Sequence, residues 1–125
     1  MEGLTFDTGA LIALERRSLR MDRVWHAALV SGRPITVPTA VVGEWWRGQK
    51  GAVTRVLDSV TIEPLTLEIA KIAGEALAGL RKGPSLVDAI VMASAAQRGD
   101  VVYTGDMDDL SSLQHRFPSV RLLRA

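Results

Sequence analysis

Along this chain of 125 residues, short continuous runs of apolar residues alternate with longer segments in which apolar residues recur every three or four positions. The runs are rich in β-branched residues and predict five strands, at residues 4–6, 34–38, 60–63, 101–104 and 120–123. Between them, apolar residues recur at helical intervals, which predicts helices. Strands that alternate with helices favour an α/β domain with a central parallel sheet of about five strands and helices on both of its faces.

The helix expected between Pro84 and Gly99 is apolar on nearly every side, so it should pack against other elements all round. Its first turn carries one carboxylate, Asp88. A buried ionised carboxylate without a partner costs more free energy than a helix of this length supplies. A local interaction can compensate this charge. Ser85 is expected to be the N-cap of the helix, which places Asp88 in a Ser-x-x-Asp capping pattern near the positive end of the helix dipole. The alternative is that Asp88 belongs to a cluster of carboxylates that holds a divalent cation.

Further acids directly follow two predicted strands. Asp7 comes after the first strand and Asp106 after the fourth, where Asp108 and Asp109 add two more carboxylates. Asp7 also suits the N-cap of the helix that follows it, whereas three acids exceed what one cap requires. In parallel sheets ligands bind beyond the carboxyl ends of the strands, so Asp7 and Asp106 converge if the first and fourth strands are neighbours.

Asp88 and Glu44 are expected at the same edge of the sheet. Asp88 begins the helix that leads into the fourth strand, and a helix antiparallel to its strand brings its N-terminus to the strand's carboxyl end. Glu44 lies on a helix expected from a cap at Thr39 to about Gln49, beside an apolar face. Its carboxylate either reaches the site from another side or is simply solvated.

Carboxylates gathered in this way require a counter-charge. Four of them within about 5 Å repel by roughly 3 kcal/mol per pair at an effective dielectric constant near 20. The sum over all pairs exceeds the stability of a typical domain, about 5–15 kcal/mol. The chain has no cysteine, and its two histidines have no metal-ligand spacing, so an all-oxygen site for Mg²⁺ or Mn²⁺ is expected. Such sites serve phosphodiester hydrolysis.

Composition narrows the class of protein further. Hydrophobic residues make up 47% of the chain and charged residues 23%, which is typical of a globular protein, and the length suits one domain, 1–125. The lack of cysteine fits a reducing compartment. The N-terminal residues have no basic region of a signal peptide, and no apolar stretch approaches the roughly 18 residues of a membrane span. We therefore expect a cytoplasmic protein with no membrane association.

Local charge is more informative than the net charge of +1, which gives no overall field. Arg16, Arg17, Arg20 and Arg23 fall within eight residues. Three of them, at positions 16, 20 and 23, can share one helix face. That face either contacts phosphates or is only solvated.

The ordered set of motifs resembles the PIN domain nucleases, and among them the VapC toxins of bacterial toxin–antitoxin pairs. The matching segments are LTFDT at 4–8, Glu44 in the helix after the second strand, SLVDA at 85–89 and TGDMDDL at 104–110. Each is weak alone, but their order and spacing are specific, and the likeness covers the whole chain. The resemblance implies a PIN fold with a five-stranded parallel sheet and Mg²⁺- or Mn²⁺-dependent endoribonuclease activity on structured RNA such as tRNA or rRNA. It also implies a homodimer and inhibition by a cognate VapB-type antitoxin.

The resemblance assigns roles to individual acids. Asp7, Glu44, Asp88 and Asp106 match the family's acidic quartet. Asp7 and Asp88 would be the principal metal ligands, and Glu44 and Asp106 would complete the site as ligands or by orienting the attacking water. Asp109 matches a further acid of the family's metal site. With this set in view, Asp88 is interpreted as a metal ligand that also caps its helix.

Neighbouring positions agree with the family in part. Thr8 and Thr104 match hydroxyls that support the carboxylates. Gly9 stands where many relatives carry Ser or Asn, which removes a donor beside the site. Leu110 stands where many carry Phe, which we interpret as a difference in packing.

Two other functions fit part of the pattern. A receiver-type phosphoacceptor domain also binds Mg²⁺ at strand ends, but it normally needs paired acids in the first loop and a lysine after a late strand. This chain has a lone Asp7 there and no lysine after Lys82. A non-catalytic PIN-like module that binds RNA or protein would keep the fold and lose some acids, whereas the quartet is complete.

Overall fold

A computed structural model describes residues 2–47 and 54–125, and in it five parallel strands form one sheet in the order β3-β2-β1-β4-β5. The strands are β1 (Leu4–Phe6), β2 (Ile35–Pro38), β3 (Thr61–Glu63), β4 (Val101–Thr104) and β5 (Arg121–Arg124). The central strand β1 pairs Leu4 with Ile35 of β2 on one side and with Val101 of β4 on the other. The predicted five-stranded parallel sheet is confirmed.

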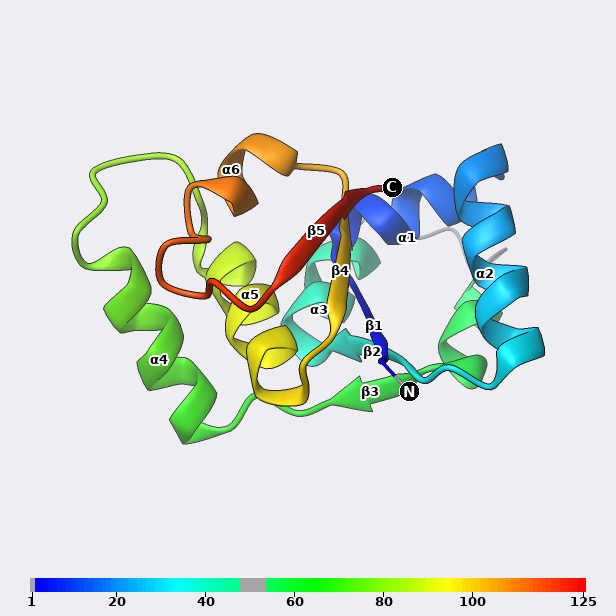
Figure 1. Ribbon diagram of the computed structural model, residues 1–125, viewed down its shortest axis with the longest axis horizontal. Coiled ribbons are helices and arrows are strands. Elements are labelled where there is room, and N and C mark those ends of the chain that lie inside the picture. Colours follow the sequence, from blue (N-terminus) through cyan, green and yellow to red (C-terminus); the bar gives the residue numbers. More distant parts are fainter. Residues whose placement is uncertain (1, 48–53) are drawn as a thin grey trace.

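The connections between the strands are helical. They are α1 (Thr8–Glu15), α2 (Leu19–Ser31), α3 (Thr39–Trp46), the 3₁₀ turn η1 (Thr54–Ser59), α4 (Leu67–Leu77), α5 (Leu86–Arg98) and α6 (Met107–Ser111). In Figure 1, α1 and α2 lie on one side of the sheet, and α4 and α5 lie on the other. Both faces of the sheet are therefore covered, as predicted. No helix in the described ranges is long and apolar enough to cross a membrane.

The strand order creates a crevice at one edge of the sheet. The chain runs from β1 outward to β2 and β3, and then returns to place β4 on the other side of β1. The carboxyl ends of β1 and β4 thus flank the point where the order reverses, which is where open α/β sheets bind ligands. Asp7 and Asp106 follow these two strands, so their predicted proximity has a topological cause.

Helix α5 is the most deeply buried helix of the described chain. Residues 89–95 are all buried, because α5 packs against α4, β1 and β4. The prediction of a helix that is enclosed on nearly every side is confirmed. Ser85 caps it and Gly99 ends it, also as predicted, and Gly99 adopts the left-handed conformation. Leu110 is fully buried, in agreement with its interpretation as a packing residue.

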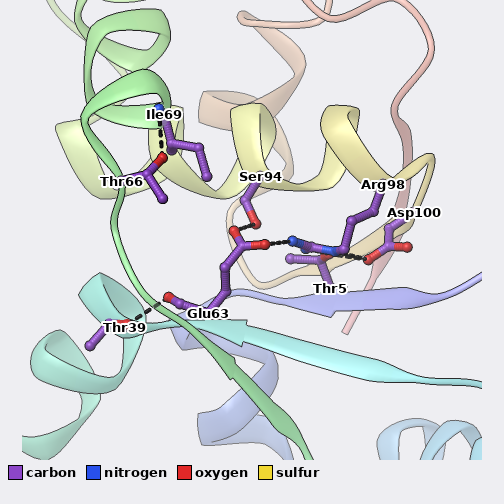
Figure 2. Close-up of polar contacts among 8 residues, drawn as sticks. All are labelled: Thr5, Thr39, Glu63, Thr66, Ile69, Ser94, Arg98 and Asp100. Atoms are coloured by element: carbon purple, nitrogen blue, oxygen red, sulfur yellow. Dashed lines mark hydrogen bonds and ion pairs between the residues drawn. The ribbon is translucent and has the colours of Figure 1, made fainter.

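A polar network fixes the C-terminal end of α5 to the sheet (Figure 2). Arg98 forms an ion pair with Glu63 of β3 and another with Asp100, whose Oδ2 lies 2.9 Å from Arg98 Nε. Arg98 Nη2 also donates to Thr5 Oγ1 at 2.8 Å, and Ser94 Oγ donates to Glu63 Oε1 at 2.6 Å. Three strands or strand ends are thereby tied to one helix that carries Asp88 at its other end.

The start of α3 differs from the prediction. Pro38 rather than Thr39 occupies the N-cap and makes no side-chain hydrogen bond. The Thr39 hydroxyl instead donates to the carbonyl oxygen of Glu63 at 2.6 Å, so it ties α3 to the end of β3. The helix ends at Trp46, and Gln49, its predicted end, lies outside the described residues.

Candidate metal centre

Asp7 sits where β1 passes into α1, with 5% of its surface exposed. It is the N-cap of α1, because its Oδ1 accepts a hydrogen bond from the Ala10 amide at 2.9 Å. The same oxygen accepts one from the Gly105 amide at 3.3 Å, and Oδ2 accepts one from the Thr104 hydroxyl. The capping role proposed for Asp7 is therefore real, and it fixes the carboxylate at the edge of the sheet.

Thr104 links the two strand ends. It is 1% exposed, and its hydroxyl donates to Asp7 and accepts a hydrogen bond from the Asp106 amide at 2.8 Å. Asp106 is itself the N-cap of α6 and accepts from the Asp109 amide at 3.3 Å. One buried hydroxyl thus sets the positions of two acids from neighbouring strands. The sequence resemblance indicated this supporting role for Thr104.

Asp88 makes a complete capping box with Ser85. The Asp88 amide donates to Ser85 Oγ at 3.2 Å, and the Ser85 amide donates to Asp88 Oδ2 at 2.9 Å. The capping interpretation is therefore confirmed. The hydrogen bond from the Ser85 amide fixes the Asp88 carboxylate at the N-terminal end of α5.

Glu44 reaches the site from α3 and is exposed. Its Oε1 accepts a hydrogen bond from the hydroxyl of Thr8, the first residue of α1. This contact favours the alternative in which Glu44 reaches the site, because it joins Glu44 to the residue next to Asp7.

Three carboxylates meet closely at this edge. Asp88, Asp106 and Asp109 each place an oxygen within 4.8 Å of the other two. Asp7 and Glu44 are outside this close group, but both line a cavity of about 210 Å³ together with Asp88 and Asp106. The predicted quartet therefore shares one cavity, and Asp109 adjoins two of its members. The convergent acidic groups are all carboxylates, and carboxylate oxygens are the donors that suit Mg²⁺ or Mn²⁺.

The electrostatics of the group show the strain of this arrangement. Burial raises the pKa of Asp7 above its usual range, and the charge of Asp88 adds to this rise, against the hydrogen bond from Thr104. Burial likewise raises the pKa of Asp88, with Asp106 and Glu44 contributing repulsion. A hydrogen bond with Asp106 is the main cause of the raised pKa of Asp109. In all three carboxyls, burial or a neighbouring acid favours the protonated form over the charged form.

A larger cavity, of about 440 Å³, lies between α1, α2, α3 and η1 and is lined by none of the five predicted site acids. Its lining includes Trp25, Trp45 and Val56. Trp45 is 4% exposed, and its Nε1 has no hydrogen-bond partner among the residues the structure describes. Sequence reasoning missed this cavity, because its walls come from four separate elements.

Fold and site together define an α/β protein with an acidic cavity at the reversal point of a parallel sheet. The sequence pattern of the PIN domain matches residues 4–115, and the chain belongs to the PIN domain family. No curated protein matches this chain in sequence.

Solved structures share the fold at low sequence identity. A chain in the crystal structure of VapBC2 from Rickettsia felis, bound to a DNA fragment from their promoter, superimposes with a TM-score of 0.76 at 13% identity, over 98% of each chain. A chain in DNA-bound VapBC from Salmonella typhimurium gives 0.70 at 17% identity, over 99% of this chain and 98% of that one. A chain of a toxin–antitoxin complex from Klebsiella pneumoniae gives 0.67 at 21% identity, over 94% and 95%. These similarities establish the fold, in agreement with the resemblance to VapC toxins.

Proposed function

We propose that this chain is a Mg²⁺- or Mn²⁺-dependent endoribonuclease, the toxin of a VapBC-type toxin–antitoxin pair, built as one PIN domain over residues 1–125. Its substrates would be structured RNAs such as tRNA or rRNA. The acidic cavity carries the proposal: three carboxylate oxygens lie within 4.8 Å of one another, and Asp7 and Glu44 line the same edge. Membership of the PIN domain family supports the same reaction class.

The residues divide into holding and positioning roles. Asp7, Asp88 and Asp106 would hold the cation, with Glu44 and Asp109 beside them. A divalent cation bound there would stabilise negative charge on the phosphate and lower the pKa of the attacking water. Thr104 holds Asp7 and Asp106 in place through its hydroxyl. Glu44 is exposed and steadied by Thr8, so its carboxylate is suited to orient a water molecule and accept its proton.

Incubation of the purified protein with total cellular RNA tests the proposal, with Mg²⁺, with Mn²⁺ and with a chelator. We expect cleavage only with a metal, and mapping of the new 5′ ends would name the target. Asp88→Asn should lower cleavage by at least about 100-fold, because it removes one ligand charge while its amide oxygen still caps Ser85. Asp58→Asn is the matched control, since Asp58 is exposed on η1 and outside the acidic group. Full cleavage by Asp88→Asn, or cleavage in chelator, would refute the metal site.

A VapB-type antitoxin is the partner we propose, since the similar solved structures include VapBC complexes and a toxin–antitoxin complex. The cavity between α1, α2, α3 and η1 offers apolar walls at Trp25, Trp45 and Val56. Charged groups also line it, at Glu15, Arg17, Asp22 and Arg55, so it is suited to a peptide segment with both apolar and charged side chains. Val56→Arg would fill this cavity with a charge. We expect it to weaken binding of the protein encoded alongside by at least about tenfold, while RNA cleavage continues.

An exposed tryptophan on α3 bears on the oligomeric state of the protein. Trp46 is 51% exposed on α3, and exposed aromatic side chains are enriched at protein interfaces. We propose a homodimer, which sedimentation of the wild type and of Trp46→Ser would test. A cytoplasmic location follows from the RNA substrates proposed.

The structure argues against one of the two alternative functions considered from the sequence, the receiver-type domain, but it does not distinguish the other from the nuclease. A receiver-type domain has the strand order 2-1-3-4-5, whereas this sheet has the order β3-β2-β1-β4-β5, so that function is not proposed. A non-catalytic binding module has the same fold as the nuclease. RNA binding without metal-dependent cleavage would favour it.

A further inference from the structure

Four arginines lie close together in the chain where α1 passes into α2. The prediction that three of them share one helix face is wrong, because α1 ends before Arg16 and α2 begins after Ser18. Arg16, Arg17, Arg20 and Arg23, here called the arginine surface, are all exposed. None of them forms an ion pair or a side-chain hydrogen bond within residues 2–47 and 54–125. The close spacing of four unpaired positive charges is unfavourable for folding, because they repel one another.

Helix stability explains only half of this cluster. Arg16 and Arg17 follow α1, where cations interact favourably with the C-terminal end of the helix dipole. Arg20 lies in the first turn of α2, where the same dipole disfavours positive charge, and Arg23 lies in the second turn, where the dipole does not stabilise it. Asp22 is the one acid in the first turn of α2.

Arg17 adds a backbone cost. Its φ of 58° makes it the one non-glycine residue with positive φ in the described chain. It follows the C-cap of α1, a position that glycine fills most cheaply. An arginine kept in an unfavourable conformation indicates a function for its side chain.

Helix α1 connects this surface to the acidic cavity. Its first residue, Thr8, lines the cavity, and its last, Glu15, precedes Arg16. Eight helical residues rise about 12 Å, which is a span of a few nucleotides. Figure 1 shows α1 running from the carboxyl end of β1 to the start of α2.

We propose that the arginine surface binds the phosphate backbone of the RNA substrate a few nucleotides away from the acidic cavity. This inference rests on the proposed nuclease function and adds the contact that positions the strand. Polyanion binding relieves both the mutual repulsion of the arginines and the unfavourable position of Arg20 in the first turn of α2. Without a cation the acidic cavity repels phosphate, and a separate cationic surface supplies attraction for RNA that does not depend on the metal.

Binding of a fluorescein-labelled single-stranded uridine 12-mer, measured by anisotropy in chelator at several salt concentrations, tests this surface without cleavage. Arg20→Gln/Arg23→Gln should weaken binding roughly 20-fold at 0.1 M salt and lower the slope of log affinity against log salt by about 1.4. Arg116→Gln/Arg121→Gln is the matched control, because it removes two exposed arginines from outside α1 and α2. Equal affinity and slope in wild type and Arg20→Gln/Arg23→Gln would overturn the proposal.

Arg17→Gly separates a binding role from a structural one. It should weaken RNA binding while Tm stays the same or rises, since glycine tolerates positive φ. A lower Tm with unchanged RNA binding would make Arg17 a structural residue and count against the surface. Loss of binding to polyglutamate, but not to the 12-mer, in Arg20→Gln/Arg23→Gln would assign the surface to an acidic protein and overturn the proposal.

The two proposals fail separately. Arginine-dependent binding of the 12-mer by a chain that cleaves no RNA would support this surface and refute the nuclease. Metal-dependent cleavage, together with 12-mer binding that does not depend on the arginines, would support the nuclease and refute the arginine surface.

Discussion

Gly9 and Gly105 lie against each other across the start of α1 and the end of β4. A β-carbon at Gly9 would stand 2.5 Å from the Cα of Gly105, and one at Gly105 would stand 2.8 Å from the Cα of Gly9. This approach lets the Gly105 amide donate to Asp7 and brings Asp7 and Asp106 to one cavity. The departure from the family at Gly9 therefore has a packing cause, because this structure has no room there for a side chain.

We expect Gly9→Ala to lower the free energy of unfolding by about 1–3 kcal/mol, because the added methyl meets backbone rather than a flexible side chain. Gly74→Ala is the control, since a β-carbon at Gly74 in α4 meets nothing within 4 Å. That control should gain about 0.5–1 kcal/mol through the better helix propensity of alanine. Urea denaturation measures both, and equal stability of Gly9→Ala and wild type would show that the two backbones can separate freely.

Thr104→Val tests whether one buried hydroxyl positions the acids. Valine has nearly the same shape, but it neither donates to Asp7 nor accepts from the Asp106 amide. We expect Mn²⁺ affinity, measured by titration calorimetry, to fall about 10–100-fold. Thr104→Ser keeps the hydroxyl and should restore most of the affinity. If the serine variant bound as weakly as the valine variant, the methyl group rather than the hydroxyl would be responsible.

The ion pairs of Arg98 predict a stability effect remote from the site. Arg98→Met would leave Glu63 and Asp100 without their cation, and Asp100 is 5% exposed. Removal of one partner from a buried pair costs about 3–5 kcal/mol, and the quarter exposure of Arg98 and Glu63 reduces the expected loss to roughly 2–3 kcal/mol. The control Arg33→Met breaks an exposed pair with Glu2 and should cost less than about 1 kcal/mol. Similar losses in the two variants would mean that the network contributes no more than a surface pair.

Sequence reasoning succeeded where the signal was local. The strand at 4–6 and the capping box of Ser85 and Asp88 follow from a few adjacent residues, and both are present. The proximity of Asp7 and Asp106 was predicted only on the condition that the first and fourth strands are neighbours. The structure shows that β1 pairs with β4.

Features that depend on distant segments could not be predicted. Glu63 and Arg98 are far apart in the chain and lie at positions with no distinctive pattern, so their ion pair becomes visible only once α5 crosses the sheet. The contact of Gly9 with Gly105 is of the same kind. The sequence around Thr39 predicted a helix cap. In the structure the Thr39 hydroxyl instead donates to the carbonyl oxygen of Glu63, a contact that depends on the position of β3.

The raised pKa values predict how the metal-free protein responds to pH. Burial raises the pKa of both Asp7 and Asp88 above the ordinary value of 3.8. The folded state therefore holds these protons more tightly than the unfolded state, so protonation favours folding. This contribution to stability is present at low pH and is lost as pH rises from 3.8 through the raised values.

Asp88→Asn isolates this effect, because asparagine cannot ionise. In chelator we expect its Tm to exceed that of the wild type by roughly 2–5 °C near pH 7, and the difference to shrink toward pH 4. Saturating Mg²⁺ should reverse the order at pH 7, because the cation stabilises the wild-type carboxylates once they have lost their protons. Asp58→Asn, with the same change of charge outside the acidic group, should follow the wild type in both conditions. A Tm difference between Asp88→Asn and wild type that stayed constant from pH 4 to pH 7 would show that packing, rather than ionisation of Asp88, causes it.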